Sequence, residues 1–106
     1  MSTYRVSLSD EFIAELRKEV LYSRKQWGDA HSKQYFAELE LHCRSVLGSA
    51  PSAFSRPRVP GTGYLKWKGH LILFEIDERQ KEVRLLDLYG RHRYFELYRR
   101  MEGGSL

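Results

Sequence analysis

A single glycine separates two segments of helical periodicity, and this feature constrains the fold of the chain more than any other. Apolar residues recur every three or four positions on both sides of Gly28, as they do along the buried face of a helix. The first stripe contains Phe12, Ile13, Leu16 and Val20, and the second contains Phe36, Leu39, Cys43, Val46 and Leu47. Two helices joined by so short a turn must pack antiparallel, so we expect a helical hairpin over residues 10–47.

Residues that begin and end helices flank both stripes. Ser9 is a preferred N-cap, and we expect the first helix to run from there to Trp27. Gly28 suits the left-handed backbone that ends a helix, Asp29 can cap the helix that follows, and Gly48 can close it. These residue types therefore predict the bounds of both helices.

Alternating apolar and polar residues predict strands on both sides of the hairpin. Residues 4–8 alternate, residues 48–63 are rich in Gly and Pro and are expected to be a loop, and residues 64–68 alternate again. In that last segment we expect Lys66 and Lys68 to share one face with Tyr64. Two further segments also indicate strands, at 70–76, apolar on both faces, and at 83–89.

The order of elements predicts an α+β fold, β-α-α-β-β-β, with the helical hairpin packed on one face of a small, mostly antiparallel sheet. The residues after the last strand are apolar enough for a short amphipathic C-terminal helix, and residues 102–106 are expected to fray. We expect the second helix to contact the sheet through its apolar stripe. The contacts predicted are Phe36, Leu39, Val46 and Leu47 against Leu71, Leu73 and Val83 or their neighbours.

Length and composition limit the class of protein. A chain of 106 residues fits one domain, 1–106, and a single cysteine allows no intrachain disulfide. We see no secretory signal and no apolar run of the roughly 18 residues that a membrane span needs, so we expect a cytoplasmic protein that does not enter membranes. The four histidines lack metal-ligand spacing and no glycine-rich loop has a phosphate-binding lysine, so we expect no metal and no cofactor.

Positive charge is confined to the second half of the chain. Residues 1–50 contain seven Lys or Arg and seven Asp or Glu, whereas residues 51–106 contain eleven and seven and carry the whole net charge of +4. A positive field of this kind attracts nucleic acid or an acidic protein. The alternative interpretation is an ordinary solvated face.

Four segments share their order and spacing with one known family. They are an aromatic residue before a Trp-Gly-acid turn at 22–30 (YSRKQWGDA), a helix end followed by a basic Pro loop at 47–58, a central strand at 69–77 (GHLILFEID), and a last strand with a basic ending at 83–93 (VRLLDLYGRHR). Together they resemble the ParE-like branch of the RelE/ParE toxin superfamily. Two positions depart from its pattern, because Gly63 and Tyr64 stand where an arginine is usual and Tyr89 replaces a histidine.

The resemblance implies the toxin of a bacterial type II toxin–antitoxin system, of the kind associated with plasmid stabilization. It implies a cognate antitoxin as partner and inhibition of DNA gyrase by binding, without an enzymatic step. On that interpretation no residue is catalytic, and the target-binding candidates are cations and aromatics of the second half. They are Lys66, Lys68, Arg84, Tyr89, Arg91, His92 and Arg93.

Two alternatives remain open. The first is suggested by the RelE branch of the same superfamily, whose members cut mRNA on the ribosome without a metal. Such cleavage requires a proton-transfer group and cations around the phosphorane. His92 or Glu75 would move the proton, Lys66, Lys68, Arg84 and Arg91 would hold the charge, and Tyr89 and Tyr94 would stack bases. The second alternative is a basic RNA-binding module that is not a toxin.

Overall fold

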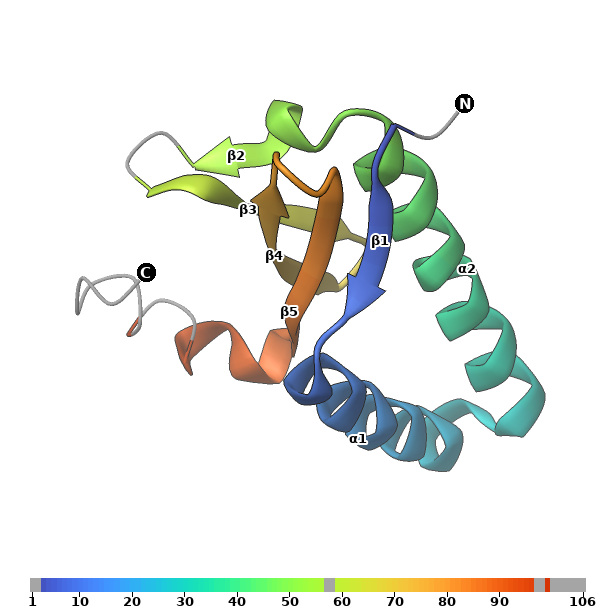
Figure 1. The fold of residues 1–106 in the computed structure, drawn as a ribbon. Coiled ribbons are helices and arrows are strands. Elements are labelled where there is room, and N and C mark those ends of the chain that lie inside the picture. Colours follow the sequence, from blue (N-terminus) through green and yellow to red (C-terminus); the bar gives the residue numbers. More distant parts are fainter. Residues whose placement is uncertain (1–2, 57–58, 97–98, 100–106) are drawn as a thin grey trace.

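The computed structural model describes residues 3–56, 59–96 and 99. The chain forms strand β1 (Arg5–Leu8), helices α1 (Asp10–Trp27) and α2 (Asp29–Ser49), a 3-10 turn (Pro51–Phe54), strands β2 (Ser55–Arg56), β3 (Val59–Trp67), β4 (His70–Asp77) and β5 (Glu82–Gly90), and a second 3-10 turn (Arg91–Arg93). The α+β fold is confirmed, and Figure 1 shows both helices beside one sheet. The frayed tail expected at 102–106 lies outside the described residues. In the part of the chain described, no helix is both long and apolar enough to cross a membrane.

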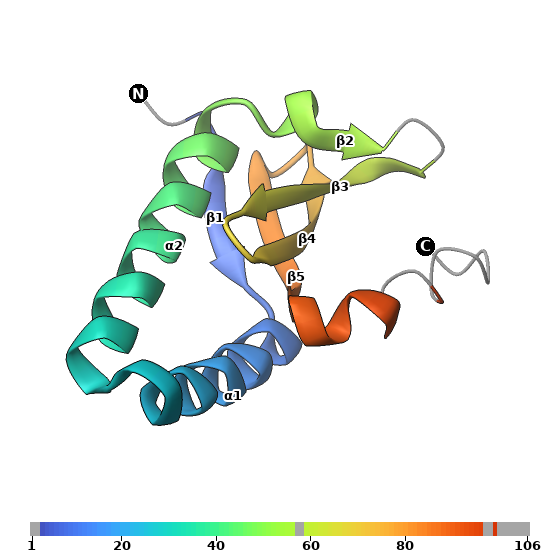
Figure 2. The ribbon, with the colours of Figure 1, turned by 180° about the vertical axis from the view of Figure 1, so that it is seen from behind.

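The predicted start of α1 and the turn that follows it are confirmed. The Ser9 hydroxyl accepts the Phe12 backbone N–H at 3.0 Å, so Ser9 is the N-cap. Gly28 has φ +89°, a backbone conformation that residues with a Cβ rarely adopt. The helices diverge from this one-residue joint (Figure 2).

Two predicted helix ends are wrong. Asp29 does not cap α2, because the joint is so short that Gly28 serves as the end of both helices and Asp29 is already helical. The Asp29 carboxylate instead pairs with Arg24 Nε at 2.6 Å. Gly48 does not close α2, which continues to Ser49. The Gly48 carbonyl accepts backbone N–H groups from Thr3 at 2.8 Å and Tyr4 at 2.9 Å, so this last turn is held by the N-terminal segment.

The sheet has five strands in the order β1-β5-β4-β3-β2. Only β1 is parallel to its neighbour, β5, and the other pairs are antiparallel. The prediction of a loop over residues 48–63 is wrong, because this segment contains a 3-10 turn, β2 and the first five residues of β3. Gly and Pro are tolerated there because β2 and the start of β3 form the edge of the sheet, where fewer ladder hydrogen bonds are required.

The main core lies between the helices and one face of the sheet. Phe36, Leu39 and Leu47 of α2 pack there, as expected, and so does Val83. Leu71 and Leu73 do not, because side chains alternate along β4 and these two point to the opposite face. The sheet residues that face the helices are Leu65, Ile72, Phe74, Val83, Leu85 and Leu88.

Cys43 belongs to the main core, as its position on the apolar stripe predicts. Burial raises the pKa of its thiol to about 12, so the sulfur stays protonated at physiological pH. A buried neutral thiol is a packing group and not a nucleophile.

The packing of α2 predicts a contrast between two leucines two positions apart. Leu39 is 1% exposed and Leu41 is 69% exposed. We expect Leu39→Ala to lower the free energy of unfolding by about 2–5 kcal/mol, because it leaves a cavity in the core. Leu41→Ala should change it by less than about 0.5 kcal/mol. Urea unfolding followed by circular dichroism measures both, and equal effects would show that the helix face is misassigned.

Candidate functional site

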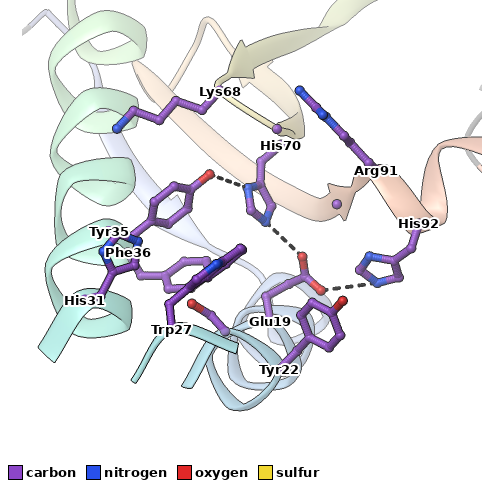
Figure 3. Close-up of a pocket in the computed structure, with 13 residues that line it drawn as sticks. Glu19, Tyr22, Trp27, His31, Tyr35, Phe36, Lys68, His70, Arg91 and His92 are labelled. Carbon is purple, nitrogen blue, oxygen red and sulfur yellow. Dashed lines mark hydrogen bonds and ion pairs between the residues drawn. The ribbon is translucent and has the colours of Figure 1, made fainter. Parts of the chain in front are cut away.

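A pocket of about 530 Å³ opens between the Gly28 turn, the β3–β4 turn and the end of β5. Figure 3 shows side chains from α1, α2, β4 and the segment after β5 converging on it. Its walls are mainly apolar and aromatic, with cations at the rim, which is typical of a ligand site. The lining residues used below are Glu19, Tyr22, Ser23, Trp27, His31, Tyr35, Lys68, His70, Gly90, Arg91 and His92.

A buried carboxylate lies at the base of the pocket. The Glu19 side chain is only 7% exposed, and its two oxygens contact two histidines (Figure 3). His70 Nε2 lies 2.8 Å from Oε1, and His92 Nε2 lies 3.3 Å from Oε2. A buried carboxylate is costly unless it is paired, so the two imidazoles stabilise it where it is.

Tyr35 extends this network to α2. Its hydroxyl lies 2.9 Å from His70 Nδ1. Burial raises the pKa of the Tyr35 phenol above its usual 10.0; a hydrogen bond with the Gly69 backbone opposes that rise, and the Glu19 charge adds to it. Tyr35 is therefore a neutral donor at physiological pH. Both contacts of the His70 ring are satisfied when the Tyr35 O–H donates to Nδ1 and His70 donates Nε2–H to Glu19.

Gly90 allows the end of β5 to approach α1. A Cβ at this position would collide with Glu19 Oε1 and would lie 2.9 Å from the His92 ring. The chain therefore needs glycine here for the close approach rather than for an unusual turn. Directly after it, Arg91 extends beside Gly69 of the β3–β4 turn, which places a cation at the rim of the pocket.

Lys68 lies in the β3–β4 turn and not on the strand, so its expected place beside Lys66 on one sheet face is wrong. Its backbone has φ +52°, which is unusual for a residue other than glycine or asparagine. This conformation directs the side chain to the helix side of the sheet, where Nζ lies 4.7 Å from the Trp67 ring centroid and 5.4 Å from that of Tyr35. Its Nζ lies 3.9 Å from a carboxylate oxygen of Glu38.

The predicted site residues fall into three groups. Lys68, Arg91 and His92 come together at the pocket. Glu75, Lys66 and Arg84 are exposed on the opposite face of the sheet, where Glu75 and Arg84 are cross-strand neighbours. Tyr89, Tyr94 and Arg93 pack around the second, smaller cluster under the C-terminal segment.

Sequence reasoning missed Glu19, Tyr35 and His70. The signal for Glu19 was present, since it follows Phe12 by seven residues and so lies on the buried face of α1. A charged residue on an apolar helix face indicates a buried pair. Nothing in the sequence identifies His70 as that partner, because the two lie 51 positions apart.

Arg93 is bound to the protein itself. Three carboxylates surround its guanidinium: Glu15 at 2.9 Å, Glu96 at 3.0 Å and Asp87 at 3.5 Å. The guanidinium also stacks 4.6 Å from the Tyr89 ring centroid. Partial burial alone would lower the pKa of Arg93, but the hydrogen bond to Glu96 and the other two carboxylates raise it above its usual value. These contacts join the C-terminal segment to α1 and β5.

Comparison with known proteins agrees with this fold. Residues 6–94 match a family described as the ParE toxin of type II toxin-antitoxin system, parDE. Among solved structures, the chromosomal ParDE TA system from P. aeruginosa has a TM-score of 0.67 at 16% identity over 83% of this chain and 96% of that one. The E. coli toxin RelE, as a mutant in the free state, has a TM-score of 0.59 at 15% identity over 100% of both chains.

A third similar structure is the toxin-antitoxin complex RelBE2 from Mycobacterium tuberculosis, with a TM-score of 0.52 at 18% identity over 86% of this chain and 94% of that one. At these identities the structural matches show a shared fold only. A search of curated proteins finds no match.

The contacts of Arg93 predict a different role from that of Arg91. Arg93→Ala should lower the free energy of unfolding by about 1.5–3 kcal/mol, because it removes charge-assisted hydrogen bonds at a side chain that is only 17% exposed. Arg91→Ala removes an exposed charge and should change stability by less than about 0.5 kcal/mol. Thermal and urea unfolding of the two variants, side by side, measure the difference. Similar losses for both would contradict these assignments.

Proposed function

The chain belongs to the ParE toxin family of type II toxin–antitoxin systems, and from that membership we propose that it acts by binding DNA gyrase, without a catalytic step of its own. The binding surface we propose is the basic rim of the pocket, formed by Lys68, Arg91 and His92. Exposed cations around a concave, partly apolar surface favour association with an acidic partner.

One observation speaks against a ribonuclease in which both proton-transfer candidates, Glu75 and His92, act together. Glu75 pairs in the sheet with Arg84, whereas His92 follows Gly90, which pairs with His70 at the other end of β4. Five residues of strand between positions 70 and 75 correspond to roughly 16 Å. Glu75 is also on the sheet face that the helices do not cover. Groups this far apart cannot act on one ribose phosphate.

We place the target surface at the pocket and not on the opposite sheet face. On that face, Arg84 has Glu75 as its cross-strand neighbour, so part of the positive charge is offset. At the pocket, Lys68 and Arg91 are both exposed, and Lys68 has only a loose contact with Glu38 at 3.9 Å. These rim cations lie beside a concave, mainly apolar surface that a protein partner can cover.

Metal-free cleavage of mRNA on the ribosome is the second candidate, and one observation favours it. His92 is 56% exposed, is held by the Glu19 carboxylate, and follows Arg91 directly. An oriented imidazole beside a cation is an arrangement that can transfer a proton near a phosphate. The two candidates differ in what the loss of His92 should do.

We further propose a cytoplasmic toxin that a cognate antitoxin neutralises. Similar folds occur in structures described as toxin-antitoxin complexes from E. coli and Mycobacterium tuberculosis. The positive charge of residues 51–106 would favour an antitoxin segment with acidic side chains. Purification of the chain together with the product of the neighbouring gene tests this partner.

The gyrase proposal is tested with two double variants that each remove two cations. Lys68→Ala with Arg91→Ala removes charge at the pocket rim, and Lys66→Ala with Arg84→Ala removes the same charge from the opposite face. In a supercoiling assay with purified gyrase and relaxed plasmid, we expect the first to raise the half-inhibitory concentration by roughly tenfold, equal to ~1.4 kcal/mol, and the second to leave it almost unchanged.

Growth assays separate binding from ribonuclease chemistry. Under the binding proposal, His92→Ala weakens killing only modestly. Loss of a general acid or base would instead cost ~10²–10⁴-fold in rate. If His92→Ala or Glu75→Ala alone abolishes killing in a folded protein, and translation stops before DNA breaks appear, the chain is a ribonuclease and the gyrase proposal is wrong.

A further inference from the structure

We propose that the pocket binds one unpaired nucleotide of a nucleic acid strand, with its base between aromatic side chains and its phosphate at the cationic rim. This inference does not depend on the protein target of the toxin, because it concerns only groups of this chain. It rests on three features of the pocket: two groups of aromatic rings in its lining, two rim cations, and a buried hydroxyl without a partner among the described residues.

Aromatic rings line two sides of the pocket. On one side, Trp27, His31 and Tyr35 follow one another, with ring centroids 5.7 Å and then 6.5 Å apart. On the other, Tyr22 lies 5.9 Å from His92. Trp27 is 61% exposed and Tyr22 is 55% exposed, although large aromatics are usually buried. Exposed rings that face a cavity are suited to stacking on the flat face of a base, whatever its sequence.

The rim supplies charge for a phosphate. Lys68 and Arg91 both line the pocket and both are exposed, so they carry two positive charges to its opening (Figure 3). Lys68 has a loose contact with Glu38 at 3.9 Å, which an incoming phosphate can replace. The volume of about 530 Å³ falls within the range of small-ligand sites, which hold roughly 300–1,000 Å³.

A buried hydroxyl faces this space without a hydrogen-bond partner. Ser23 is 3% exposed, it lines the pocket, and its Oγ has no partner among the described residues. Buried polar groups are almost always hydrogen-bonded, so the Ser23 hydroxyl at the wall of the cavity is available to a group that enters it. The edge of a base carries donors and acceptors that match a hydroxyl.

The experiment compares strands with and without bases. Fluorescence anisotropy of the purified full chain, with no gyrase present, is measured with labelled ten-nucleotide strands of dT, of U, and of an abasic deoxyribose phosphate. All three carry similar charge, so a difference between them reports on the bases. We expect at least one base-bearing strand to bind about 5- to 150-fold more tightly than the abasic strand, which is the range for stacking one base. The preference between dT and U then identifies DNA or RNA as the natural strand.

Variants locate the binding in the pocket. Trp27→Ala should reduce the preference for base-bearing strands to near onefold, while Leu41→Ala, an exposed residue of α2 outside the pocket lining, should leave it unchanged. Ser23→Ala should lower the same preference several-fold without exposing any new surface. Lys68→Ala should weaken binding of all strands and reduce its salt dependence, whereas Lys66→Ala should do so much less.

Three results would overturn the proposal. One is equal binding of the base-bearing and abasic strands, which would mean that only phosphate charge is recognised. Another is a preference for bases that survives both Trp27→Ala and Ser23→Ala. The third is that Lys66→Ala and Lys68→Ala lower the affinity for the strands equally. None of these outcomes bears on gyrase inhibition, which the supercoiling assay tests separately.

Discussion

The pairing of the Glu19 carboxylate with two histidines is the interaction on which the arrangement of the site depends. Glu19 belongs to α1, His70 begins β4, and His92 follows β5, so one side chain joins three separate parts of the chain. Through His70 the same network reaches Tyr35 on α2. A buried carboxylate is tolerated only with partners of this kind, and these contacts link both helices to the ends of β4 and β5.

The elements of the fold could largely be predicted from the sequence, because local patterns determine them. The apolar stripes, Ser9 and Gly28 predicted α1 and the turn after it, and the family resemblance is confirmed. The errors arose where the tertiary structure decides. Gly48 lies inside α2, where its carbonyl accepts hydrogen bonds from the N-terminal segment. Leu71 and Leu73 lie on the sheet face away from the helices, and this could not be predicted because β4 is apolar on both faces.

The site was predicted less well, for a related reason. The sequence identifies Lys68, Arg91 and Arg93 as cations, but it does not show which of them are exposed and which are paired with carboxylates of the same chain. Arg93 is held by three carboxylates of this chain, whereas Arg91, two positions earlier, is exposed at the pocket rim. The two histidines that contact Glu19 lie 51 and 73 positions from it along the chain, and such a pairing is visible only in the folded chain.

The pairing of β1 with β5 also determines when the protein can first fold during its synthesis. Arg5 is in register with Glu82 and Leu8 with Leu85, so β1 has no neighbour in the sheet until residues 82–85 have been made. Contacts of such long sequence separation form late. A nascent chain that has emerged only as far as the helices lacks both β5 and the pocket, and has no means of acting on a target. The sheet and the pocket are therefore completed at the same stage of synthesis, because the strand that pairs with β1 leads directly into Gly90, Arg91 and His92 of the pocket lining.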